Sequence, residues 1–122
     1  QKVTIYYLDR ISNNNYYVPV TKYLNDDRDK ADIVIDELSS SFNYNKNLKS
    51  FLNSDTKLQR FDLKNNVLSL AFNSYIYDNT LENSISDEVK DMILLSMNDN
   101  YNIKQVVFTV DNKEIYKSEI SN

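Results

Sequence analysis

The sequence has 122 residues, of which 41% are apolar and 26% are charged, as expected of one water-soluble domain with its own hydrophobic core. Its net charge is -4 and its lysines are scattered singly, which excludes the basic stripe that nucleic-acid binding requires. No apolar run approaches the roughly 18 residues of a membrane helix, and the absence of cysteine excludes disulfides and thiolate catalysis.

A β-hairpin is predicted at the start of the chain. Residues 3–8 and 16–21 alternate apolar with polar side chains on either side of a polar turn at residues 12–15. Pro19 lies in the second strand and cannot donate a ladder hydrogen bond. We therefore expect this strand at a sheet edge, or with the backbone nitrogen of Pro19 facing away from the neighbouring strand.

An amphipathic helix is predicted after the acidic run at residues 26–29. That run suits a helix N-terminus, where carboxylates cap free N–H groups and meet the positive end of the dipole. A calcium-binding loop is the alternative, but such a loop requires a glycine that this segment lacks. Apolar side chains recur at helical spacing at Ala31, Val34, Ile35, Leu38 and Phe42.

The middle of the chain is predicted to contain a second hairpin. Leu48, Phe51 and Leu52 predict one short helical turn that caps the core, and residues 57–63 then read as a strand.

The pair Asn65–Asn66 predicts a two-residue turn before a strand at residues 67–72, and residues 73–83 predict a packed loop. The chain has no glycine, and its abundant asparagine indicates the A/T-rich codons of a low-G+C genome. We therefore expect asparagine at turn positions that require positive φ.

A second amphipathic helix is predicted to begin near Ser84 or Ser86, with acidic residues in its first turn. Its predicted buried side chains are Ile85, Val89, Met92, Ile93, Ser96 and Met97. Residues 103–110 form a nearly continuous apolar run, and a turn at residues 111–112 leads to a last strand at residues 114–116. The order β-β-α-β-β-α-β-β predicts a single α+β domain over residues 1–122, with a mixed or antiparallel sheet packed against two main helices.

Most enzyme classes are excluded by composition. Without glycine there is no phosphate loop, dinucleotide-binding turn or nucleophile elbow, and without histidine there is no ordinary catalytic triad. Two carboxylates could still act as acid and base in glycoside cleavage. Most of them lie in first helical turns or on polar helix faces, so we predict no enzyme and assign no catalytic, cofactor-binding or metal-binding residue. The carboxylates considered are Asp26, Asp29, Glu37, Asp62, Glu82, Asp87, Glu88 and Asp91.

The ten tyrosines are the unusual enrichment. Strand propensity, codon bias and core packing explain much of it, and the remainder is typical of protein interfaces or of sugar-stacking sites. A sheet edge can accept a strand from a neighbouring chain, and aromatic side chains beside it would anchor that chain. We take Tyr6, Tyr16, Tyr17 and Pro19 as candidate partner-binding residues. The alternative is that these tyrosines pack on the face of their own sheet.

Several segments together resemble the GerM domain, the sporulation and spore germination module of Gram-positive bacteria. Residues 3–7 (VTIYY) and 17–22 (YVPVTK) match its first two strands, and residues 107–112 (VFTVDN) match its closing Val-x-x-Val-Asp-Gly. Residues 31–38, 48–58 and 70–73 match the segments between. The chain departs from the pattern at Asn53, which replaces a proline, and at Asp55, which replaces a glycine.

The resemblance implies a non-enzymatic extracytoplasmic domain that supports assembly of an envelope complex. It would be anchored as a lipoprotein or by a single N-terminal helix outside these residues, in keeping with a sequence that begins at Gln1 without a hydrophobic leader. Its partners would be envelope proteins and, by analogy with ring-building modules, further copies of itself. The alternative is a module that binds cell-wall peptidoglycan through exposed tyrosines.

Overall fold

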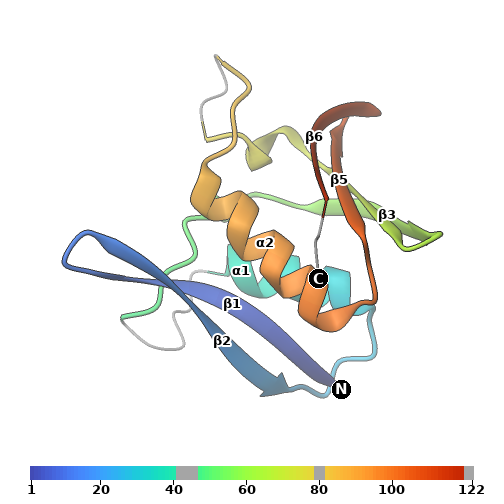
Figure 1. The fold of residues 1–122 in the computed structure, drawn as a ribbon. Helices are drawn as coiled ribbons and strands as arrows, with labels where there is room; N and C mark the ends of the chain where they lie inside the picture. Colours follow the sequence, from blue (N-terminus) through green and yellow to red (C-terminus); the bar gives the residue numbers. More distant parts are fainter. Residues whose placement is uncertain (41–46, 79–81, 120–122) are drawn as a thin grey trace.

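The computed structural model describes residues 1–40, 47–78 and 82–119 (Figure 1). Its element order matches the predicted β-β-α-β-β-α-β-β, with one short 3-10 helix added. The elements are β1 (Lys2–Ile11), β2 (Asn14–Tyr23), α1 (Lys30–Ser39), β3 (Leu58–Lys64), β4 (Val67–Phe72), η1 (Ser74–Ile76), α2 (Asp87–Asn100), β5 (Gln105–Val110) and β6 (Lys113–Glu119).

The strands form two sheets. β1 pairs with β2 in an antiparallel hairpin, and the other four strands lie in the order β3-β4-β5-β6. Within this larger sheet β4 and β5 run parallel, while both outer pairs are antiparallel. The chain between β4 and β5 passes through α2, and a crossover of that kind returns the chain in the parallel direction. The α+β class predicted from the sequence is confirmed. Of the two sheet types expected, the four-stranded sheet is mixed, and the β1–β2 hairpin forms a separate antiparallel sheet.

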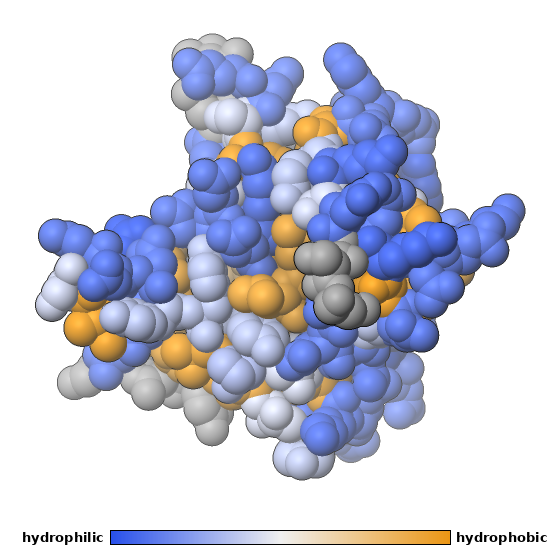
Figure 2. All heavy atoms as spheres, in the orientation of Figure 1, coloured by the Kyte–Doolittle hydropathy of each residue, from blue (hydrophilic) through white to orange (hydrophobic). Residues whose placement is uncertain are grey.

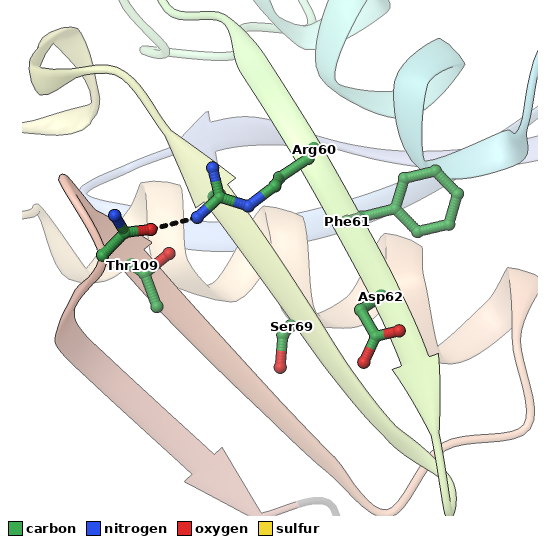
Figure 3. A pocket seen from close by; sticks show the side chains of 7 residues that line it. Arg60, Phe61, Asp62, Ser69 and Thr109 are labelled. Atoms are coloured by element: carbon green, nitrogen blue, oxygen red, sulfur yellow. Dashed lines mark hydrogen bonds between the residues drawn. The ribbon is translucent and has the colours of Figure 1, made fainter.

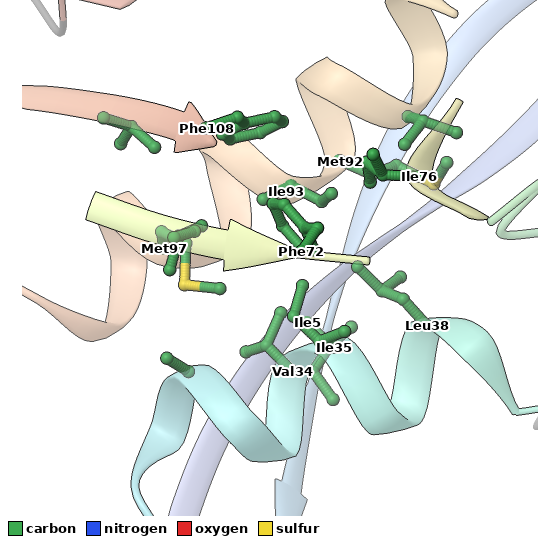
Figure 4. Packing of buried hydrophobic residues seen from close by; sticks show 14 of the residues in the cluster. Ile5, Val34, Ile35, Leu38, Phe72, Ile76, Met92, Ile93, Met97 and Phe108 are labelled. Atoms are coloured by element: carbon green, nitrogen blue, oxygen red, sulfur yellow. The ribbon is translucent and has the colours of Figure 1, made fainter. Parts of the chain in front are cut away.

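The two helices lie between the β1–β2 hairpin and the four-stranded sheet (Figure 1). The buried apolar side chains join into one cluster drawn from both sheets and both helices (Figure 4). Phe72 of β4 and Phe108 of β5 meet edge to face, with ring centroids 5.1 Å apart. The opposite face of the sheet, which includes Ser69 and Thr109, is not covered by either helix.

Asparagine occupies four of the six central positions of the tight hairpin turns, in line with the prediction, and Ser12 and Asp111 occupy the other two. Each of the three tight hairpin turns has positive φ at both central residues, a type I′ geometry that other proteins usually build with glycine. These pairs are Ser12–Asn13 (50° and 68°), Asn65–Asn66 (54° and 65°) and Asp111–Asn112 (51° and 64°).

The two helices begin differently. α2 starts as predicted, because the Ser86 side chain accepts a hydrogen bond from the Val89 N–H at 3.3 Å. At α1 the expected carboxylate cap is wrong, since Asp29 makes no side-chain cap bond. Asp26 instead binds Arg28 at 2.9 Å. Phe42, predicted on the buried face of α1, lies outside the described residues.

The helical turn predicted at Leu48, Phe51 and Leu52 is wrong, because residues 48–52 contain no helical turn. Lys49 pairs with Leu8 through two backbone hydrogen bonds of 2.8 Å. Those bonds supply partners for the Leu8 N–H and C=O, which face away from β2, and a helical turn would leave them unsatisfied. Leu48 is nevertheless buried, and Phe51 has a positive φ of 60°.

Candidate functional site: the β1–β2 hairpin

The β1 edge of the hairpin is closed by side chains of α2. Asn100 accepts a hydrogen bond from the Thr4 N–H at 3.1 Å and donates one to the Thr4 C=O at 2.6 Å. The buried Ser96 hydroxyl accepts a hydrogen bond from the Tyr6 N–H at 2.9 Å. With Lys49 on Leu8, the outward backbone groups along the middle of β1 are occupied.

The β2 edge of the hairpin is open. Thr4, Tyr6 and Leu8 lie opposite Thr21, Pro19 and Tyr17 in the register. Because Thr4, Tyr6 and Leu8 bond outward, these are the non-hydrogen-bonded pairs of the ladder, in which both residues point their N–H and C=O away from the partner strand. The N–H and C=O of Tyr17 and Thr21, and the C=O of Pro19, therefore face away from β1. No hydrogen bond to these groups occurs among the described residues.

Pro19 accordingly fulfils both parts of its prediction. It lies on an edge strand, and its backbone nitrogen faces away from β1. The side chain is exposed, opposite Tyr6.

The three candidate tyrosines do not form one surface. Tyr6 and Tyr17 are partly buried on the side of the hairpin that meets α2. The Tyr17 hydroxyl donates to the Asp91 carboxylate at 2.8 Å, and burial together with that carboxylate raises the pKa of Tyr17 well above its usual range. Burial and the nearby carboxylate of Asp99 also raise the pKa of Tyr6. Tyr16 lies on the other face of the hairpin, opposite Asp9, and is 50% exposed.

The hairpin is fixed to α1 by its other face. Tyr7 is buried there, as the alternation of Tyr6 with its neighbours requires. The Lys22 ammonium lies 5.5 Å from the centre of the Tyr7 ring and 2.8 Å from the Glu37 carboxylate of α1. The hairpin is therefore held by both helices, which leaves β2 as its open side.

Tyr23 is a surface aromatic that the sequence analysis did not select. At 78% exposed, it is the most exposed of the large hydrophobic side chains described. It borders a surface pocket of about 420 Å³ that Thr21, Lys22, Leu24 and Glu37 also line. Strand alternation could have identified Tyr23, since it points to the same side as Thr21 and Pro19.

A second pocket of about 270 Å³ lies on the uncovered face of the larger sheet (Figure 3). Arg60, Asp62, Ser69 and Thr109 project into it, and the Arg60 guanidinium donates to the Asn112 side chain. Phe61 points away from this group in Figure 3. Phe61 and Ala71 also line the pocket, so its wall combines polar and apolar groups.

The carboxylates considered for catalysis are dispersed. Glu37, Asp62 and Glu88 each line a different pocket. Asp78, which the sequence analysis did not consider, shares a pocket with Glu88, Phe51 and Arg10. Glu88 is ion-paired there, with Arg10 at 3.5 Å.

In residues 1–40, 47–78 and 82–119 there is no group of three side chains able to hold a metal ion. Within these ranges no helix is long and apolar enough to cross a membrane.

The sequence profile of the Germane family, described as "Sporulation and spore germination", matches residues 4–116. This chain belongs to the Germane family. The resemblance seen in its strand motifs is thereby confirmed. Spore germination protein GerM of Bacillus subtilis (strain 168) is 31% identical to this Germane domain over 115 residues. The match covers 91% of this chain and 31% of that protein, so this chain spans about a third of its relative.

Solved structures of related domains share the fold of this Germane domain. The tandem GerMN domains of the Bacillus subtilis sporulation protein GerM match it with a TM-score of 0.81 at 30% identity, covering 93% of this chain and 39% of that chain. The first GerMN domain of that protein matches with a TM-score of 0.68 at 16% identity, covering 99% and 94% of the two chains. A lipoprotein candidate from Clostridium perfringens matches with a TM-score of 0.54 at 18% identity, covering 93% and 76%. At these lower identities the last two matches show the fold alone.

Proposed function

We propose that this Germane domain is a non-enzymatic, extracytoplasmic domain that binds other proteins within a cell-envelope complex. The observation that carries the proposal is the open β2 edge, where unpaired backbone groups lie beside exposed Pro19 and Tyr23. Its membership of a sporulation and germination family supports a role in that process.

The carboxylates support binding rather than catalysis. Glycoside cleavage requires one carboxyl group that stays protonated at neutral pH, usually in an apolar environment. Asp78 and Glu88 line the same pocket, but the Arg10 guanidinium lies 3.5 Å from the Glu88 carboxylate, so Glu88 does not lie in a purely apolar environment.

A protein partner suits the surface better than cell-wall glycan does. Sugar-binding sites present aromatic faces next to polar groups. Tyr16 and Tyr23 lie on opposite faces of β2 and about 23 Å apart along the strand, so they do not make a common platform. Tyr75, 49% exposed, belongs to η1. Unpaired strand edges, in contrast, are a common means of protein recognition.

Photo-cross-linking in living cells tests the interaction. A photoreactive phenylalanine analogue would replace, one at a time, the exposed residues Ile11, Tyr23, Leu63 and Tyr75 of the full-length protein. These residues lie on β1, β2, β3 and η1 and therefore sample separate surfaces. We expect specific protein adducts from at least one position. The absence of adducts at all four positions would refute the proposed function.

Location is tested separately. We expect added protease to degrade the protein in intact protoplasts while a cytosolic marker survives. Protection of the full-length protein until the membrane is lysed would contradict an extracytoplasmic location.

A further inference from the structure

Among the outer strands β2, β3 and β6, β2 carries the fewest charged side chains. Outer strands are normally guarded by charged side chains that disfavour pairing with another chain. β3 and β6 follow this rule, with charged residues at Arg60, Asp62, Lys64, Lys113, Glu114, Lys117 and Glu119. In its ten residues β2 has only Lys22, and that ammonium is bound to Glu37.

The open edge of β2 offers two hydrogen-bonding sites separated by Pro19. Tyr17 and Thr21 each present an outward N–H and C=O, and they lie about 13 Å apart along the strand. Pro19 between them presents only its C=O. An extended segment alongside β2 would therefore pair fully with Tyr17 and Thr21 and accept no hydrogen bond at the centre. Such a gap limits unselective pairing while leaving both ends available.

The pocket beside Tyr23 would receive a side chain of that added strand. Tyr23 and Leu24 provide apolar walls, and Glu37 provides a carboxylate. Lys22 binds one Glu37 oxygen, and a carboxylate can accept further hydrogen bonds. A long side chain with an apolar stem and a cationic end fits these three groups.

Charge near this end of β2 also favours a basic partner. Six acidic and two basic residues occur between positions 26 and 37, directly after the strand. Arg28 is ion-paired with Asp26 and Asp36. Burial raises the pKa of Asp32, and the neighbouring carboxylates add to this effect against the opposing charge of Arg28.

We infer that β2 accepts an added strand from an extended, basic segment of a partner protein. The backbone of that segment pairs with Tyr17 and Thr21, and one of its lysine or arginine side chains enters the pocket at Tyr23. This inference rests on the proposed protein-binding function and specifies its geometry and partner chemistry.

Titration of the isotope-labelled domain with synthetic peptides tests the inference by NMR. The probe is an eight-residue peptide that alternates lysine with threonine or valine, and the control peptide has glutamate in place of lysine. We expect the lysine peptide to shift the amide signals of Tyr17 and Thr21, to slow their hydrogen exchange, and to bind at least tenfold more tightly than the control. Equal binding of both peptides, or unchanged amides on β2, would overturn the inference.

Two changes separate strand pairing from attraction by charge alone. Thr21→Pro removes an outward N–H without removing a backbone hydrogen bond to β1, although it also removes the exposed 3.4 Å contact between the Thr21 and Thr4 hydroxyls. Glu114→Pro is the matched control at an outward position of β6. We expect only Thr21→Pro to weaken binding of the lysine peptide by tenfold or more. N-methylation of alternate amides in the lysine peptide should weaken its binding to the unaltered domain by a similar factor. This second measurement keeps the test valid if Thr21→Pro unfolds. Glu37→Gln should weaken binding at least threefold, and an unchanged affinity would remove the pocket from the inference.

The outcome distinguishes the inference from the proposed function. If Thr21→Pro in the full-length protein still gives every cross-link that the unaltered protein gives, the strand-addition geometry is wrong and the binding function stands. If the unaltered protein gives no protein cross-links, the proposed function itself is wrong.

Discussion

Asn100, the last residue of α2, forms two hydrogen bonds with the backbone of Thr4, accepting from its N–H at 3.1 Å and donating to its C=O at 2.6 Å. The two residues are 96 positions apart in the sequence. The Asn100 side chain thus makes the two backbone hydrogen bonds with Thr4 that a neighbouring strand would otherwise make.

Removing this amide side chain should loosen the hairpin. Asn100→Ala leaves a partly buried N–H and C=O without partners, and we expect the free energy of unfolding to fall by about 1–3 kcal/mol. Asn98→Ala, at an exposed position of the same helix, should change it by less than about 0.5 kcal/mol. Urea denaturation measures both variants, and equal effects would show that Asn100 does not hold β1.

Tyr17 should make the domain sensitive to alkaline pH. Its pKa is raised in the folded state, so the folded phenol keeps its proton where the unfolded phenol, with a pKa of about 10, loses it. The contribution of Tyr17 is therefore fully present below about pH 10 and is lost as pH rises above that value.

Denaturation between pH 8 and 11 tests this role. Above about pH 10 the free energy of unfolding should fall less steeply with pH for Tyr17→Phe than for the unaltered domain. The difference in slope should correspond to about one proton per molecule. Tyr16→Phe is the control, because the Tyr16 side chain is 50% exposed on the other face of β2. Identical pH profiles for Tyr17→Phe and the unaltered domain would contradict the role of the Asp91 bond.

The first tight turn should respond to backbone preference alone. Asn13 has φ of 68°, so we expect Asn13→Gly to be neutral or stabilising and Asn13→Val to destabilise by about 1–2 kcal/mol. Asn14→Val, one residue later in the extended strand, should cost less than about 0.5 kcal/mol. Thermal unfolding compares the three variants. A similar loss from both valine substitutions would mean that φ does not limit this position.

Pro19 should restrict self-association. Pro19→Thr restores an outward N–H at the centre of the open edge, and we expect concentration-dependent dimers in analytical ultracentrifugation. The double variant Pro19→Thr/Thr21→Pro, which again lacks one outward N–H, should return to the behaviour of the unaltered domain. If Pro19→Thr sediments as the unaltered domain does, the gap at Pro19 is not what limits pairing.

Asp78 and Glu88 should be dispensable for any chemistry on glycans. We expect the domain to release no more reducing ends from purified peptidoglycan than Asp78→Asn/Glu88→Gln does. Asp62→Asn/Glu37→Gln serves as the control, since these carboxylates line other pockets. Hydrolysis that only the Asp78→Asn/Glu88→Gln variant loses would overturn the non-enzymatic proposal.

Local pattern was sufficient to predict the element order, the tight turns and most of the core. Alternation in residues 3–8 and helical spacing from Ala31 to Leu38 reflect which face of each element is buried, and that information is carried by neighbouring residues. The asparagine turns were equally predictable, because positive φ is a property of the residue itself. Pro19 was placed correctly on an edge for the same reason.

The tertiary structure alone decided what each edge of the hairpin contacts. Which tyrosines bind carboxylates of α2, and which remain exposed, depends on residues such as Asp91 that lie far away in the sequence. The backbone conformation at Lys49 likewise depends on a distant residue, because Lys49 supplies the hydrogen-bond partners of the Leu8 N–H and C=O. The helical spacing of the nearby apolar residues did not reveal this pairing. Sequence periodicity describes the buried face of one segment at a time. Side chains of α2 bond to the outer edge of β1, so β2 is the edge of the hairpin that stays open. Only packing of the whole chain brings α2 and β1 together.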